Sequence, residues 1–184
     1  MASSWQTHKT TLVYENPWIS VTHREVTAPT GKAGIYGVVH FKNSAIAIIP
    51  IDSEGNTWLV GQQRYPTEHY SWEVPEGGAL HRESRLRAAQ RELREETGIV
   101  AGMWTSLAYS HLSNSVSDET AVAFVARDLS FTNTELDDTE LLELKKLPLA
   151  DAIDMAMHGS ITDALSLLAL LKLKALIDDR MLVI

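Results

Sequence analysis

Residues 77–99 read GGALHRESRLRAAQRELREETGI, and the fold of the chain follows from this stretch. Glu92, Glu95 and Glu96 fall within five positions of one another. On a helix these carboxylates point to a common side, where like charges repel. They also lie near the carboxyl end of the helix, where the helix dipole disfavours negative charge. Such a cluster requires either compensating protein cations or a bound metal ion.

The second half of the stretch is predicted to form a helix over residues 83–97. It contains no proline or glycine, and its apolar residues recur at spacings of three and four, which places them on one face (Leu86, Ala89 and Leu93). Gly98 can adopt the left-handed conformation that ends many helices. The carboxylate oxygens suit Mg2+ or Mn2+. The alternative is an exposed acidic face paired with the basic residues Arg87, Arg91 and Arg94.

Spacing over the whole stretch favours the metal site. From Gly77 onward the sequence fits G-x5-E-x7-R-E-U-x-E-E-x-G-U, where U is a bulky aliphatic residue. Every fixed position is filled, by Gly77, Glu83, Arg91, Glu92, Leu93, Glu95, Glu96, Gly98 and Ile99. This pattern resembles the Nudix box, and the chain is identified as a member of the Nudix hydrolase superfamily.

The resemblance implies a fold and a set of site residues. The fold is α/β, a Nudix α/β/α sandwich with a mixed central sheet, in which a loop–helix–loop binds divalent metal. The metal residues it implies are Glu92, Glu95 and Glu96, supported by Glu83 and by a backbone carbonyl near Glu76. Arg91 is expected to orient the glutamates through salt bridges, with a bidentate contact to a carboxylate. The implied cofactor is Mg2+ or Mn2+.

Further segments resemble the ADP-ribose pyrophosphatase branch of the family. They are LVGQQRYP at 59–66, WEVPEGG at 72–78 and MHGSITDALSLLALLKL at 157–173. The substrate-binding residues that this resemblance implies are Arg64, Glu73, Gly77 and Gly78. It also implies an N-terminal antiparallel β extension over residues 1–42, which takes part in a homodimer interface, and a Nudix hydrolase domain over 43–184 with its box at 77–99.

One departure from the branch concerns the substrate. The branch usually carries a proline soon after the box, whereas Asn114 and Ser115 stand in this place. The expected substrate is therefore ADP-ribose or a related nucleotide sugar. A general base is needed to activate water, and the acidic segment 134–144 supplies candidates. Glu140 is the first of these, ahead of Asp137 and Asp138, and Glu119, outside the segment, is a weaker candidate. The alternative for the segment is a solvated acidic loop.

Other side chains have two interpretations each. Arg64 could bind substrate, by pairing with a phosphate or by stacking on a base, and the alternative is a surface salt bridge. The aromatic residues Trp18, Tyr36 and Trp72 either stack on adenine or belong to the core. The histidines His69, His81 and His111 lack ligand spacing, and we assign them no role.

Hydrophobic patterning predicts strands, then the box helix, then strands and helices. The expected strands cover 11–14, 19–23, 35–41, 45–51, 57–64, 102–109 and 120–126. The expected helices follow at 149–158, ending at Gly159, and at 161–174, where Thr162 or Asp163 caps the first turn.

Composition limits the classes of function. The 184 residues carry a formal net charge of −8, which argues against general nucleic-acid binding. The absence of cysteine excludes disulfides and thiolate metal sites. We expect a cytoplasmic protein without a membrane contact, acting on a small nucleotide.

Three other functions compete with this hypothesis. The chain could be a catalytically inactive Nudix nucleotide-binding or sensor module. Nudix domains that have lost catalysis usually lack some of the box glutamates, whereas all of them are present here. It could hydrolyse dinucleoside polyphosphates. Isopentenyl diphosphate isomerase shares the fold, but the resemblance implies an active-site cysteine that this chain lacks.

Overall fold

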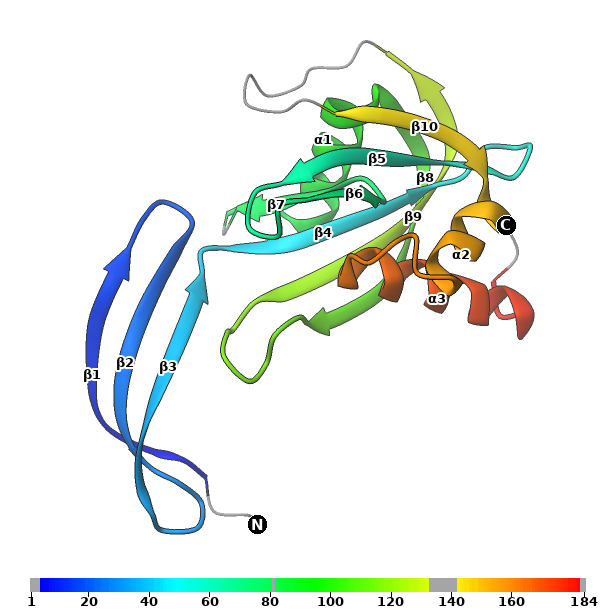
Figure 1. The fold of residues 1–184 in the computed structure, drawn as a ribbon. Coiled ribbons are helices and arrows are strands. Elements are labelled where there is room, and N and C mark those ends of the chain that lie inside the picture. Colours follow the sequence, from blue (N-terminus) through cyan, green and yellow to red (C-terminus); the bar gives the residue numbers. More distant parts are fainter. Residues whose placement is uncertain (1–3, 81, 133–141, 183–184) are drawn as a thin grey trace.

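This computed structural model describes residues 4–80, 82–132 and 142–182. Within them lie ten strands and three helices (Figure 1). In chain order they are β1 (Gln6–Glu15), β2 (Ile19–Thr27), β3 (Ala33–Phe41), β4 (Asn43–Pro50), β5 (Asn56–Arg64), β6 (His69–Glu73), β7 (Glu76–Leu80), α1 (Arg85–Thr97), β8 (Ile99–His111), β9 (Thr120–Phe131), β10 (Glu143–Pro148), α2 (Leu149–Met157) and α3 (Ala164–Asp178).

The N-terminal strands form an antiparallel sheet of their own in the order β1-β2-β3, which projects from the rest of the molecule (Figure 1). Every residue of β1 is exposed. The sheet is joined to the body by the short β3–β4 connection and by backbone hydrogen bonds to the β8–β9 loop. The Val39 N–H donates to the Val116 carbonyl (2.9 Å), and the Asp118 N–H donates to the Val39 carbonyl (3.2 Å).

The body contains two sheets. The larger is mixed, with the order β7-β4-β9-β8, because β4 runs parallel to β9 while the other pairs are antiparallel. The smaller is antiparallel, with the order β10-β5-β6. The turn after β6 therefore carries the chain from one sheet to the other, directly before the box.

Side chains on β4 alternate between two cores, one on each side of the mixed sheet. Ile46 and Ile48 are buried with the apolar face of α1, and Ala47 and Ile49 are buried with α2 and α3. Alternation of this kind is the period of a strand buried on both faces. The arrangement confirms the expected α/β/α sandwich, with α1 on one face and the C-terminal helices on the other.

The box helix begins and ends where its sequence provides caps. The Ser84 hydroxyl accepts a hydrogen bond from the Arg87 N–H, so α1 starts at Arg85, two residues after the predicted Glu83. Gly98 ends the helix with φ of 69°, in the left-handed region. The small side chains on one face of α1, with one leucine, are fully buried against the sheet (Ala88, Ala89 and Leu93).

Several elements differ from the sequence-based expectation. Gly77 and Gly78 lie in strand β7, paired with β4, rather than in a loop. Strands β6 and β10 were not predicted, because as the two edges of the smaller sheet they lack a clear apolar alternation. Helix α3 starts after Asp163, which caps it by accepting from the Ser166 N–H, and it continues beyond the predicted Lys174 to Asp178.

We predict that Gly98→Ala lowers the free energy of unfolding by about 1 kcal/mol, because a β-carbon is disfavoured in the left-handed region. Urea denaturation measures this as a lower midpoint at unchanged slope. The matched control is Gly34→Ala in β3, where a β-carbon meets no atom within 4 Å and φ is not positive. An equal midpoint shift in both variants would contradict the assignment of Gly98 as the helix cap.

Candidate active site

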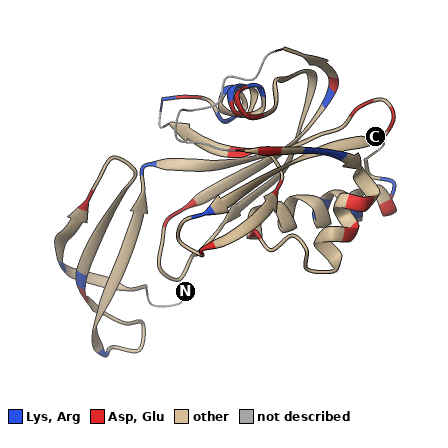
Figure 2. Cartoon of the chain, turned by 45° about the horizontal axis from the view of Figure 1, so that its top comes forward, with Lys and Arg blue, Asp and Glu red and all other residues tan. Residues whose placement is uncertain are grey.

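Arg91 is the centre of the site. Its guanidinium offers five N–H groups, and each one meets an oxygen. Two bind the Glu83 carboxylate (3.3 and 3.2 Å), one binds Glu92 (2.8 Å), one binds Glu95 (2.9 Å) and one binds the Gly78 carbonyl (2.9 Å). The expected ion pairs of Arg91 are therefore present, and the bidentate one is made with Glu83. Figure 2 shows the mixture of acidic and basic residues along α1.

Glu92 is packed against the backbone of β7. The Gly78 N–H donates to its Oε1 (3.0 Å), and a β-carbon on Gly77 would stand 2.0 Å from its Cδ. Gly77 is thus required to leave room for this carboxylate, which turns into the strand rather than into solvent. Burial raises the pKa of Glu92, and Arg91 and the Gly78 N–H only partly offset this effect.

Glu96 is fixed by the first residue of β7. It is only 7% exposed, and the Glu76 N–H donates to its Oε2 (3.1 Å). The Glu76 carboxyl points elsewhere and accepts a hydrogen bond from the Ser166 hydroxyl (2.7 Å). Burial and the neighbouring Asp163 carboxylate raise the pKa of Glu76 well above its usual value. The backbone of Glu76 thus faces the box helix while its side chain faces α3.

The donor set fits a hard divalent cation. Glu92, Glu95 and Glu96 supply carboxylate oxygens, which such a cation prefers. The Glu92 carboxylate lies in space that a side chain at position 77 would fill. In the arrangement described, the carboxylates are turned to Arg91 and to backbone N–H groups. Within residues 4–80, 82–132 and 142–182, no three acidic or imidazole side chains converge on one point as metal ligands.

A second ion pair lies on the smaller sheet. Arg64 at the end of β5 binds both carboxylate oxygens of Glu73 at the end of β6, and Gln62 also donates to Glu73 (3.3 Å). Glu73 is 2% exposed, whereas the Arg64 side chain is 41% exposed. Arg64 therefore makes a salt bridge, and its accessible edge remains free to meet a ligand.

Comparison with known proteins identifies the family. The NUDIX domain model matches residues 41–165, and the model of the nucleoside diphosphate sugar hydrolase N-terminal domain matches residues 5–39. The chain belongs to the Nudix family. It is a Nudix pyrophosphohydrolase similar to the ADP-ribose pyrophosphatases, and hydrolases of this family generally use divalent metal ions.

Relatives of this chain carry different names. ADP-ribose pyrophosphatase of Bacillus subtilis (strain 168) is 30% identical over 154 residues, which cover 83% of each chain. Methanol dehydrogenase activator of Bacillus methanolicus is 28% identical over 166 residues, 89% of each chain. A crystal structure of an ADP compounds hydrolase superposes with a TM-score of 0.87 at 23% identity, over 98% of this chain and 97% of the other, which shows the shared fold.

Several of the other candidates lie outside the described residues, namely Glu140, Asp137, Asp138 and His81. Glu119 is half-buried at the start of β9, and burial raises its pKa. Trp72 packs against the core beneath the Lys145 ammonium, 3.7 Å from the ring centre, whereas Trp18 is 65% exposed. His69 and His111 lie at the surface, at a strand start and a strand end.

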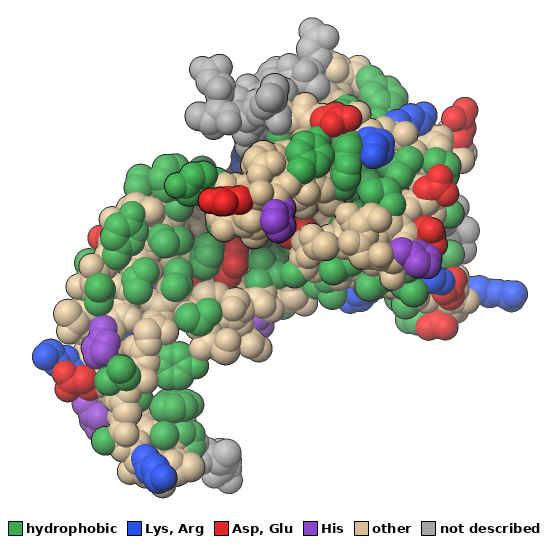
Figure 3. Space-filling model, in the orientation of Figure 1, with side chains coloured by type: hydrophobic (Ala, Val, Ile, Leu, Met, Phe, Trp, Pro, Cys, Tyr) green, Lys and Arg blue, Asp and Glu red, His purple; other side chains and the backbone are tan. Residues whose placement is uncertain are grey.

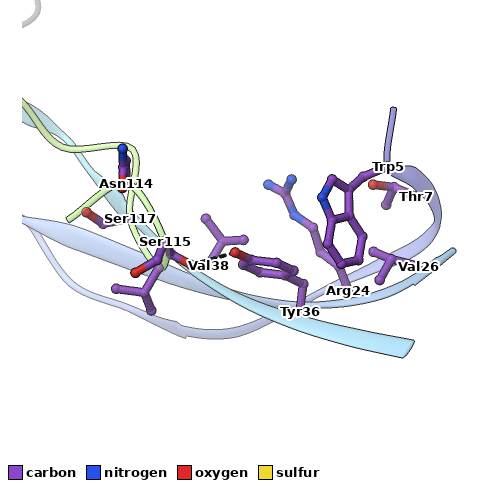
Figure 4. A pocket seen from close by; sticks show the side chains of 10 residues that line it. Trp5, Thr7, Arg24, Val26, Tyr36, Val38, Asn114, Ser115 and Ser117 are labelled. Carbon is purple, nitrogen blue, oxygen red and sulfur yellow. Dashed lines mark hydrogen bonds between the residues drawn. The ribbon is translucent and has the colours of Figure 1, made fainter. Parts of the chain in front are cut away.

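Tyr36 lines a hollow of about 250 Å³ between the N-terminal sheet and the β8–β9 loop (Figure 4). Its hydroxyl donates to the Ser115 carbonyl (2.6 Å), and its ring meets Trp5 edge to face, with centroids 5.4 Å apart. Asn114 and Ser115, which replace the proline of the branch, lie at this junction. The loop that departs from the branch is thus the one that contacts the N-terminal sheet.

Sequence reasoning missed Ser166. Its hydroxyl contacts residues on the β6–β7 side of the body, about ninety positions away in the chain. A single serine within an apolar helix carries no pattern that indicates such a contact. The only local indication was the cap at Asp163, which fixes where the helix begins.

We predict that Gly77→Ala weakens Mn2+ binding by about tenfold or more, because the added β-carbon displaces Glu92. Isothermal titration calorimetry of the folded variant measures this affinity. Gly37→Ala in β3 is the control, since a β-carbon there meets nothing within 4 Å. If Gly77→Ala bound Mn2+ as tightly as the wild type, Glu92 would not be a ligand in this position.

Proposed function

We propose that this Nudix enzyme uses Mg2+ or Mn2+ to cleave the pyrophosphate bond of a nucleoside diphosphate linked to another moiety, with ADP-ribose or a related nucleotide sugar as substrate. The observation that carries the proposal is the acidic cluster of the box helix beside β7, in which Arg91 binds Glu92 and Glu95 and the Glu76 N–H binds Glu96. It is supported by two relatives named ADP-ribose pyrophosphatase, from Bacillus subtilis and from Mycobacterium tuberculosis, the latter 29% identical over 75% of this chain and 67% of the relative.

Each residue of the site has a role in this proposal. Glu92, Glu95 and Glu96 hold the cation, and the backbone of Glu76 borders the same place. A bound divalent cation offsets the charge of the diphosphate and lowers the pKa of a bound water. Arg91 keeps the carboxylates at the strand edge, and its bidentate contact with Glu83 fixes the guanidinium itself.

The remaining groups bind substrate or move a proton. Arg64 presents its accessible guanidinium edge to a phosphate, while the buried Glu73 orients it. Gly77 and Gly78 bring the backbone of β7 close to the carboxylates. For the general base we keep Glu140 as first candidate, although it lies outside the described residues. Glu119 is the second; it is half-buried, and burial raises its pKa above the usual value of a carboxyl group.

Hydrolysis of dinucleoside polyphosphates and ligand sensing without catalysis are the competing functions. The relative from Bacillus methanolicus, named an activator of methanol dehydrogenase, shows that names within this group extend beyond ADP-ribose pyrophosphatase. None of the described helices is long and apolar enough to cross a bilayer. We propose that the enzyme acts in the cytoplasm on a small nucleotide.

We also propose that residues 1–42 form an extension that helps to build a homodimer. Hydrophobic side chains gather over the N-terminal sheet (Figure 3). Those more than half exposed are Trp5, Leu12, Val13, Tyr14, Trp18 and Ile35. Exposed apolar groups in such number on one small sheet are typical of a protein interface. A second copy of the chain is the occupant that the resemblance implies.

We predict that Glu96→Gln lowers kcat for ADP-ribose by more than about 100-fold, because the loss of a ligand costs more than the 10–100-fold typical of its outer partners. The reaction is run with Mg2+ or Mn2+, and chromatography measures the rate at which AMP and ribose 5-phosphate are released. Glu54→Gln is the control, in the exposed β4–β5 turn. A wild type inert towards ADP-ribose, nucleotide sugars and dinucleoside polyphosphates would favour the sensor function.

We predict a dimer in solution, with about twice the 20.4 kDa mass of one chain. Val13→Glu in β1 places a charge among the exposed apolar groups and is expected to shift the equilibrium to monomer. Light scattering coupled to size-exclusion chromatography measures the mass. The control is Met157→Glu on α2, where the apolar side chain is exposed to a similar degree as that of Val13. A monomeric wild type would contradict the proposed interface.

A further inference from the structure

The turn between β6 and β7 leads into the strand that carries Gly77 and Gly78. It is not a hairpin, because β6 belongs to the smaller sheet and β7 pairs with β4 in the mixed sheet. Pro75 in this turn accepts one hydrogen bond, from the Ile48 N–H (2.9 Å). Because Ile48 belongs to β4, this bond ties Pro75 to the mixed sheet. The residues on either side of Pro75 have a further contact, which comes from α3.

Ser166 supplies such a contact on both sides of Pro75. Its hydroxyl oxygen accepts from the Val74 N–H (3.1 Å), and its hydroxyl hydrogen is donated to Glu76 Oε1 (2.7 Å). The residue is fully buried in the first turn of α3. Its own N–H is held by the Asp163 carboxylate (2.7 Å), so the helix end that carries the hydroxyl is itself fixed.

The same residue that Ser166 holds also contacts the box helix. The Glu76 side chain is bound by Ser166, and the Glu76 N–H donates to the Glu96 carboxylate (3.1 Å). Hydrogen bonds thus run from α3, on one face of the mixed sheet, through the turn to Glu96 on the opposite face. Groups that hold a metal ligand in this way affect metal affinity without touching the ion.

We propose that Ser166 is a positioning residue for the metal-binding edge: by tying Val74 and Glu76 together it sets where the Glu76 N–H holds Glu96. The inference rests on the proposed metal-dependent function. Its role is distinct from general packing of α3, because the hydroxyl contacts the sheet-crossing turn rather than another helix.

The test is Mn2+ affinity, followed through the electron paramagnetic resonance signal of free Mn2+ without any substrate. Ser166→Ala is expected to weaken Mn2+ binding about tenfold, and Ser166→Thr, which keeps the hydroxyl, to restore most of the affinity. Ala169→Gly is the matched control. Ala169 lies one turn further along α3 and is equally buried, and its replacement lowers helix stability without removing a hydrogen-bonding side chain.

Each outcome decides between the two proposals. If Ser166→Ala binds Mn2+ like the wild type, or if Ala169→Gly weakens binding as much, Ser166 has no positioning role. If the wild type binds no Mn2+, the proposed function itself fails. Should Ser166→Ala not fold, Ser166→Cys replaces it, because the thiol keeps the volume but is a weaker donor. Wild-type Mn2+ affinity in Ser166→Cys then overturns the inference.

Discussion

The guanidinium of Arg91 holds the box glutamates and strand β7 together. All of its N–H groups are used, and its partners come from the loop before α1, from α1 itself and from β7. Without this group the carboxylates of Glu92 and Glu95 would repel each other beside a helix end of the same sign. The positive charge of Arg91 thus holds these acidic groups by the same kind of attraction that a divalent ion supplies. It keeps the acidic groups close together at one strand.

The sandwich supplies the fixed surfaces that this interaction needs. Ala88 and Ala89 let α1 approach the mixed sheet closely, and Gly77 removes the one side chain that would displace Glu92. On the far face, α3 reaches through Ser166 to the turn that begins β7. Hydrogen bonds therefore reach the acidic cluster from elements on both faces of the sheet.

Local patterns predicted the parts of the structure that are locally determined. The box helix, its cap at Gly98 and the buried strand β4 follow from apolar spacing and glycine placement within a few residues. The start of the box as a strand was missed, because two successive glycines carry no strand pattern and the pairing with β4 is a tertiary contact. The edge strands β6 and β10 were missed for a similar reason, since they are short and rich in polar residues. The contact of Ser166 with Glu76 joins residues far apart in the chain, which no periodicity encodes.

The central claim is that the carboxylates of Glu92, Glu95 and Glu96 are the ligands of a divalent cation. The most direct measurement is an anomalous difference map from crystals of the protein grown with Mn2+ and collected near the manganese absorption edge. We expect a peak bordered by the carboxylates of Glu92, Glu95 and Glu96, with these side chains turned from their present contacts towards the ion. Strong manganese peaks elsewhere in the molecule, with none beside these three carboxylates, would contradict the account.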